Sequence, residues 1–281
     1  MPLVPQEQAR DQAPVHDQGP SDSSRKERYD AVRARIAAAA VRIGRRAEDV
    51  VLVAVTKHAS IDQIRELIEL GHTDLGENRV QHLVQRVAQV DEYLQRHRQL
   101  GRGGEGRMPE QVRWHMVGHL QRNKVRKVVN VVRLIHSVDS LRLAEEIQTA
   151  AARREEPVEV LIQVNSSHER TKCGVAPAAV RHLIEQIDTM MSIRPRGLMC
   201  LAPLCDDSEG ARPTFERCRE LFDDIRHDGV GGDRFNILSM GMSNDFEIAI
   251  ECGANIVRVG SAIFGEEATE EGAEARHEGT K

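Results

Sequence analysis

Short apolar runs alternate with longer amphipathic stretches along most of this chain. Residues 25–42 are rich in alanine and carry apolar side chains at helical spacing, which predicts a helix. Residues 50–56 (VVLVAVT) are too short and too β-branched to form a second helix and predict a buried strand. Apolar side chains recur at helical spacing through residues 61–68, and Gly71 can adopt the left-handed conformation that ends a helix. The first repeating unit is therefore a strand, a helix and the next strand.

The same alternation continues through the rest of the chain. Further strands are predicted at residues 73–75, 113–117, 134–138, 158–164, 196–201, 236–238 and 256–259. Helices are predicted at residues 80–94, 122–131, 141–152, 178–190, 215–226 and 246–252. Regular alternation gives a parallel sheet, and eight strands close most economically into a single α/β barrel of the (β/α)8 TIM type, without exposed edges. A doubly wound open sheet is the alternative.

Three segments stand outside the alternation. Residues 1–24 hold four of the ten prolines and few large apolar side chains, which predicts a disordered tail. The last sixteen residues hold six glutamates, and residues 267–281 are interpreted as a solvated acidic tail. The glycine-rich segment 101–108 is interpreted as a surface loop, because the alternation continues across it. One barrel domain is thus expected over residues 25–266.

Charge and cysteine content narrow the choice of partner and compartment. With 39 Lys and Arg against 44 Asp and Glu, the net charge is −5, so no strongly basic field recruits nucleic acid or an anionic membrane. Five cysteines without a C-x-x-C pair, in a chain without a long apolar run, predict a reduced, cytoplasmic protein. A small-molecule ligand is therefore expected, on a monomer or a weak dimer.

A lysine follows the first predicted strand. In a barrel of this type the chemistry lies at the carboxyl ends of the strands. Lys57 comes directly after VLVAVT, so its ammonium would project into the barrel mouth. Partial desolvation there lowers the pKa of a lysine and frees its amine as a nucleophile, as a Schiff-base lysine requires. The alternative is a lysine that simply leaves the strand for solvent, and this residue alone favours that alternative.

Two glycine turns follow the last two strands and favour a phosphate site. Residues 238–244 (LSMGMSN) lead from a strand into a helix, and Asn244 and Glu247 have the spacing of a capping box, which leaves backbone N–H groups free for an anion. Residues 258–261 (RVGS) end the last strand, and residues 262–265 could form the short extra helix of a barrel phosphate site. Either turn alone is an ordinary tight loop; together they favour phosphate.

Two other clusters carry weaker signals. His115 and His119 are four residues apart, as in a helical metal pair, but WHMVG resembles a strand and no third ligand has supporting spacing, so no metal site is predicted. A basic cluster has no interleaved aromatic residues and predicts a solvated helix face. It comprises Arg122, Lys124, Arg126 and Lys127.

Eight collinear segments resemble the pyridoxal phosphate homeostasis protein family, in the family's order and spacing over roughly residues 27–266. They are AVTKHASIDQI (54–64), GENRVQ (76–81), WHMVGHLQRNK (114–124), IHSVDS (135–140), QVNSSHERTKCG (163–174), RGLMCL (196–201), LSMGMSNDFEIAIECG (238–253) and VRVGSAIFG (257–265). Eight collinear motifs are far more specific than one.

The resemblance implies a barrel similar to the barrel domain of alanine racemase. The homeostasis protein family itself binds pyridoxal 5′-phosphate without a firmly assigned reaction. It implies that Lys57 forms the Schiff base with the cofactor and that Arg258 faces the pyridine nitrogen. The residues implied to hold the phosphate are Ser239, Met240, Gly241, Gly260 and Ser261. Those implied to surround the rest of the cofactor are Asn78 and His119, which line the mouth, and Met199 beneath it.

The chain departs from the family pattern on the rim. His58 and Ala59 stand where relatives often have Lys or Pro, His168 replaces a glycine, and Arg79 replaces a tyrosine. These changes bear on rim chemistry rather than on cofactor binding. A further loop matches the family and either reaches the mouth or forms a structural ion pair. Its matching residues are Asn165, Glu169, Lys172 and Gly174.

Three functions fit these observations. The first is a carrier or homeostasis factor that holds pyridoxal phosphate and passes it to apo-enzymes, without strong catalysis and with no catalytic residue assigned. The second is a racemase-like enzyme, which needs an acid or base on the opposite face of the cofactor, and no second domain is visible to supply one. The third is a Schiff-base aldolase that uses Lys57 with a sugar phosphate. The first is favoured.

Overall fold

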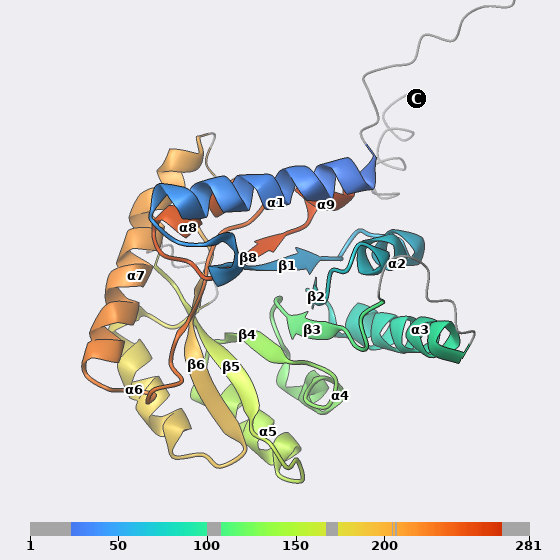
Figure 1. Cartoon of the computed structure of the whole chain (residues 1–281). Coiled ribbons are helices and arrows are strands. Elements are labelled where there is room, and N and C mark those ends of the chain that lie inside the picture. The colour runs from blue at the N-terminus through green and yellow to red at the C-terminus, as the bar shows by residue number, and fades with distance from the viewer. Residues whose placement is uncertain (1–23, 100–107, 167–173, 204, 206, 266–281) are drawn as a thin grey trace, which may run out of the picture.

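The computed structural model describes residues 24–99, 108–166, 174–203, 205 and 207–265. Within these residues eight parallel strands form a closed barrel in the order β1 to β8 (Figure 1). The strands are β1 (Val51–Val55), β2 (Asp74–Glu77), β3 (Arg113–Met116), β4 (Leu134–Val138), β5 (Val158–Val164), β6 (Ile193–Cys200), β7 (Ile237–Ser239) and β8 (Ile256–Val259). The predicted (β/α)8 barrel is confirmed, and the open sheet is excluded.

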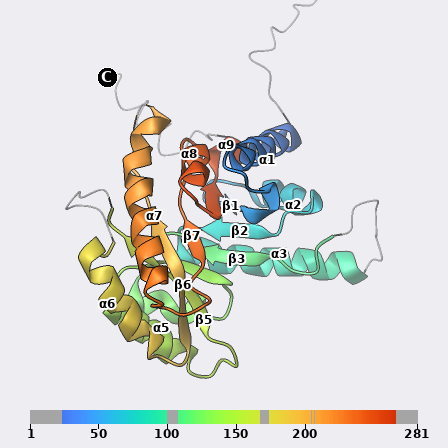
Figure 2. The ribbon, with the colours of Figure 1, turned by 60° about the vertical axis from the view of Figure 1, so that its left-hand side comes forward.

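Helices surround the barrel. They are α1 (Arg25–Arg42), α2 (Ile61–Glu69), α3 (Val80–Gln99), α4 (Val125–Val128), α5 (Leu141–Ala151), α6 (Pro177–Asp188), α7 (Arg212–His227), α8 (Phe246–Glu251) and α9 (Ser261–Phe264). Short 3-10 turns are η1 (Ala47–Asp49), η2 (Arg122–Lys124) and η3 (Ser208–Ala211). The first helix packs across α8 and α9 (Figure 1), and α6 and α7 cover the side of the barrel formed by β5 and β6 (Figure 2). No helix in the described part of the chain is long and apolar enough to cross a membrane.

Several element boundaries differ from the predictions. The helix predicted at 122–131 is a 3-10 turn followed by the four residues of α4, and α7 begins three residues before the predicted start. The predicted capping box is wrong, because α8 begins at Phe246 and its N-cap is Asp245. Glu247 instead pairs with Arg35 of α1, with 2.7 Å between Oε2 and Nη2. The predicted tails and the 101–108 loop, apart from Ser24 and Met108, lie outside the described residues.

The barrel interior is partly apolar and partly polar. An apolar cluster fills it, separate from the larger core between barrel and helices, and comprises Val53, Leu134, Leu161, Met199 and Ile256. Side chains alternate between the two faces of a strand, so residues two positions further along also point inward. On three strands those residues are polar and buried: His136 on β4, Arg258 on β8 and, after Ile237, Ser239 on β7. A polar layer therefore lies on the carboxyl side of the apolar one.

Candidate functional site

A cavity of about 590 Å³ opens at the carboxyl ends of the strands, where a barrel of this type carries its chemistry. Five of the predicted site residues line it: Lys57, Asn78, Arg258, Gly260 and Ser261. Its remaining walls include Val55, Val117, Leu201, Met242, Ser243, Asn244 and Phe264. The lining residues come from the ends of β1 and β8 and from the segments that follow β1, β2, β3, β6, β7 and β8.

The loop that carries Lys57 is fixed by hydrogen bonds to Arg86 of α3. Arg86 of α3 donates hydrogen bonds to the carbonyl oxygens of Thr56 and Ala59, on either side of Lys57, and to the carboxylate of Glu77. Glu77 is fully buried and also accepts from the Thr56 hydroxyl. The side chain of Lys57 itself is exposed, so the desolvation expected at the strand end is not provided. The fold fixes the lysine backbone and leaves its amine accessible.

The loops after β7 and β8 meet at Ser243. Its Oγ accepts hydrogen bonds from the backbone N–H groups of Gly260, at 3.2 Å, and Ala262, at 3.4 Å. Gly241 makes this turn possible, because its φ is +87° and a Cβ there would lie 2.7 Å from the Cβ of Ala249. Two N–H groups and a hydroxyl thus converge on one wall of the cavity.

Arg258 lines the cavity floor and is only 4% exposed. Its Nη1 donates to Ser239 Oγ at 2.6 Å, and its Nη2 donates to the carbonyl oxygen of Cys200 at 3.0 Å. Among the described residues Arg258 forms no ion pair, although the carboxylate of Asp245, which lines the same cavity, acts on it electrostatically. Burial lowers the pKa of Arg258, but an arginine in a protein remains a cation and a donor.

The other predicted site residues do not line the cavity. Ser239 and Met240 are fully buried, and the Ser239 hydroxyl is engaged by Arg258. Met199 belongs to the apolar cluster in the barrel interior. His119 is exposed, with its Nδ1 3.4 Å from an Asp139 oxygen. His115 is buried in the barrel, so the sequence pair 115 and 119 does not come together.

Ser243 and Asn244 are site residues that the sequence reasoning missed. Their signal is the LSMGMSN motif itself, in which the second serine rather than the first reaches the cavity. The family loop after β5 cannot be placed at the mouth, because its residues 167–173 lie outside the described residues.

Comparison with known proteins identifies the class first. Residues 28–268 match the family described as alanine racemase, N-terminal domain. An alanine racemase from Clostridium difficile shares the barrel fold, with a TM-score of 0.57, 16% identity and coverage of 79% of this chain and 54% of that one.

More similar proteins identify the family itself. The pyridoxal phosphate homeostasis protein of Aquifex aeolicus is 37% identical over 244 residues, which are 85% of this chain and 97% of that protein. That of Escherichia coli K12 is 36% identical over 235 residues, or 83% of this chain and 93% of its own. PipY of Synechococcus elongatus, solved with pyridoxal phosphate bound, has a TM-score of 0.70, 29% identity and coverage of 86% and 100%. The chain therefore belongs to the pyridoxal phosphate homeostasis protein family, which confirms the resemblance.

Buried histidines lie behind the site. Burial lowers the pKa of His72 to about 4, and its ring lies between the hydroxyl of Tyr29 and the carbonyl oxygen of Asp74, 3.2 and 2.9 Å away. Burial also holds the pKa of His136 well below its usual value, assisted by the neighbouring His115 and Arg258. Both rings are therefore neutral in the folded protein at pH 7.

Lowering the pH from 7 to 4.5 should destabilise the fold through His72. Its folded pKa of about 4 lies below the ordinary 6.5, so the unfolded chain binds the proton more tightly, and stability present above pH 6.5 is lost as the pH falls. The expected loss in the free energy of unfolding is about 2 kcal/mol. Urea denaturation at several pH values measures it.

The decrease in the free energy of unfolding with falling pH should be smaller in His72→Gln than in the wild type. It should be unchanged in His182→Gln, since the side chain of His182 is 74% exposed. Paired carboxylates such as Asp74 lose their contribution to stability mainly below about pH 4. Changes in stability between pH 7 and 4.5 therefore come mainly from histidines. Equal slopes in wild type and His72→Gln would contradict the assignment.

Proposed function

We propose that this chain binds pyridoxal 5′-phosphate in the cavity as a Schiff base on Lys57 and acts in pyridoxal phosphate homeostasis or carriage. The observation that carries the proposal is that a lysine, a buried arginine and converging N–H and hydroxyl groups line one cavity. Its volume falls in the range of about 300–1,000 Å³ typical of small-molecule sites. The names of the relatives and the cofactor in PipY support the same ligand.

The donor set at Ser243 suits the phosphate. The N–H groups of Gly260 and Ala262 already point at a common acceptor, and the hydroxyls of Ser243 and Ser261 lie on the same wall. Charge-assisted hydrogen bonds of this kind are among the strongest in proteins. We therefore assign phosphate binding to Ser243, Asn244, Gly260 and Ser261. Ser239, Met240 and Gly241 do not line the cavity and would support the site indirectly. Ser239 would hold Arg258, and Gly241 would shape the turn.

The remaining lining residues suit the ring. Oδ1 of Asn78 is buried and has no hydrogen-bond partner among the described residues, so a polar group on a ligand would satisfy it. Arg258 would face the pyridine nitrogen and donate to it. The exposed Lys57 amine is free to add to the aldehyde carbon, with loss of water, which forms the C=N bond.

The same site is poorly suited to chemistry at an amino acid's α-carbon. Pyridoxal phosphate is a strong electron sink when a carboxylate keeps its ring nitrogen protonated. Arg258 is a permanent donor and has no carboxylate at ion-pair distance among the described residues, so it favours the unprotonated ring. Exchange of the Schiff base onto an incoming amine needs no such sink. Carriage without strong catalysis is therefore favoured over racemisation.

Reduction of the loaded protein with borohydride should attach the pyridoxyl group to Lys57. Peptide mapping by mass spectrometry locates the label, and Lys57→Ala should abolish it because no other lysine among the described residues lines the cavity. Lys124→Ala is the matched control and should label normally. A label on Lys124 or Lys172 instead would contradict the assignment.

Incubation of the loaded protein with L-alanine in deuterated water should give little exchange of the α-proton and little D-alanine. The reason is the unprotonated ring imposed by Arg258. NMR and chiral chromatography measure the two products. Turnover near ordinary enzyme rates, on the order of 10 per second, would support the racemase-like alternative instead.

Carriage predicts direct transfer of the cofactor. Mixed with an apo-enzyme that requires pyridoxal phosphate, the loaded protein should reactivate it faster than free cofactor appears in solution alone. Lys57→Ala loaded under the same conditions provides the control, since it lacks the covalent store. Reactivation no faster than spontaneous release would argue against carriage while leaving cofactor binding intact.

A further inference from the structure

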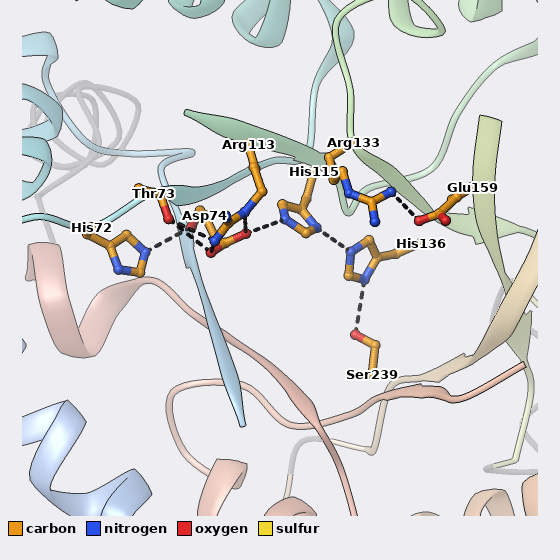
Figure 3. A network of polar contacts seen from close by, with 9 residues as sticks. All are labelled: His72, Thr73, Asp74, Arg113, His115, Arg133, His136, Glu159 and Ser239. Carbon is orange, nitrogen blue, oxygen red and sulfur yellow. Dashed lines mark hydrogen bonds and ion pairs between the residues drawn. The ribbon is translucent and has the colours of Figure 1, made fainter. Parts of the chain in front are cut away.

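A continuous line of buried hydrogen bonds leads from Arg258 to the amino end of β2, and Figure 3 shows its part from Ser239 to Asp74. From Ser239 Oγ, which accepts from Arg258, it continues to Nδ1 of His136 at 3.0 Å. Nε2 of His136 lies 3.0 Å from Nδ1 of His115, and Nε2 of His115 lies 3.2 Å from Oδ1 of Asp74. Each side chain in the line belongs to a residue no more than 8% exposed.

The chemistry of the end groups sets the direction of every bond. Arg258 can only donate, so Ser239 Oγ accepts from it and must use its own hydrogen on His136. His136 is neutral, because burial holds its pKa well below the usual value, and since its Nδ1 accepts from Ser239, its single proton lies on Nε2. Asp74 can only accept, so Nε2 of His115 donates to it, and a His115 ring that carries this one proton accepts the hydrogen bond of His136 at Nδ1.

The carboxylate at the far end is itself fixed. Arg113 donates to both oxygens of Asp74, from Nε at 2.8 Å and from Nη2 at 2.5 Å. Burial alone would raise the pKa of Asp74, but the hydrogen bonds from Arg113 and His115 hold it well below its usual range. Asp74 is therefore an anion, and it gives the line a permanent acceptor at its end.

We propose that Ser239, His136, His115 and Asp74 form a one-way hydrogen-bond relay that positions Arg258 at the cofactor site. The proposal rests on the proposed function for the identity of the ligand. These are positioning residues, because only Arg258 lines the cavity. Every neutral group in the relay turns its acceptor toward the buried cation and its donor toward the anion, so the dipoles stabilise both charges.

This arrangement has a reason beyond filling space. Buried polar groups cost free energy unless each is satisfied, and elsewhere the interior is filled by aliphatic side chains such as Leu161 and Ile256. With no carboxylate at ion-pair distance among the described residues, Arg258 depends on Ser239 and the Cys200 carbonyl for its orientation. A reversed relay would place a donor against the guanidinium. The relay thus holds the remaining N–H groups of Arg258 toward the cavity.

The barrel offers a matched control in Glu159. It is 9% exposed, against 8% for Asp74, and it pairs with two cationic side chains, those of Arg133 and Arg196, whereas Asp74 pairs with Arg113 and His115. Its hydrogen bonds within the described part of the chain go to these two arginines, and Figure 3 shows its pair with Arg133 apart from the line that ends at Ser239. Neutralising Glu159 therefore removes a comparable carboxylate while leaving the relay whole.

The decisive experiment compares Asp74→Asn with Glu159→Gln. Titration with pyridoxal phosphate, followed by absorbance, should show binding weakened about fivefold or more in Asp74→Asn, the size of a typical coupling between distant sites. The absorption band of the bound cofactor should also shift, because the orientation of Arg258 changes. Glu159→Gln should keep wild-type affinity and spectrum. Equal effects of the two variants, or no effect of Asp74→Asn, would overturn the relay.

A second measurement does not depend on the ligand or on a variant. Long-range ¹H–¹⁵N spectra of the wild-type protein at pH 7.5 should show His136 and His115 both protonated on Nε2 and not on Nδ1. A proton on Nδ1 of His136 would overturn the proposal directly. If wild-type protein fails to bind pyridoxal phosphate, the proposed function fails, and these spectra still decide whether the relay exists.

Discussion

The pairing of β8 with β1 is the contact on which the rest of the site depends. In its register Val53 lies opposite Arg258 and Ala54 opposite Val259, so both strands end together. Lys57 and Gly260 then leave the barrel at neighbouring points, although about two hundred residues separate them in the chain. Closure of the barrel brings its first and last strands into contact, which is why Lys57 and the loops that we propose bind phosphate face one cavity.

Closure of the barrel also buries the positive charge of Arg258 in the interior. Arg258 points inward from β8, where a cation without a partner would be very costly. Its hydrogen-bond acceptors are neutral, the Ser239 hydroxyl and the Cys200 carbonyl, and the Asp245 carboxylate acts on it without forming an ion pair. A carboxylate there would keep the pyridine ring of the cofactor protonated and promote catalysis. The absence of one at ion-pair distance, among the described residues, links the packing of the barrel to a role in holding cofactor.

Much of this could be predicted from the sequence, for identifiable reasons. Strands and helices differ in their apolar patterns, so their alternation along the chain predicted the barrel. The position of Lys57 directly after a strand predicted that it lies at the barrel mouth. The sequence could not show which of the two serines of LSMGMSN lines the cavity, because that depends on where β7 ends. Ser239 is the last residue of β7 and is buried inside the barrel, whereas Ser243 lies beyond the strand and lines the cavity. The Asn244 capping box failed because α8 takes Asp245 as its N-cap, and the carboxylate of Asp245 bonds the N–H of Met242.

The relay left no signal in the sequence. Its members come from β2, β3, β4, β7 and β8, and no local spacing connects Asp74 to Ser239. The spacing of His115 and His119 likewise gave no indication that the partner of His115 in space is His136 on the next strand. Spacing along the chain identifies contacts within one helix or turn, whereas contacts across a barrel depend on register.

The central claim is that one cavity binds both the aldehyde and the phosphate of pyridoxal phosphate. Equilibrium titration of the wild-type protein with pyridoxal phosphate and with pyridoxal, which lacks the phosphate, tests it most directly. Two or more charge-assisted hydrogen bonds at about 1.5–3 kcal/mol each predict that pyridoxal binds about a hundredfold more weakly or worse. Inorganic phosphate should compete with pyridoxal phosphate. Equal affinity for the two compounds, or no binding of either, would contradict the account.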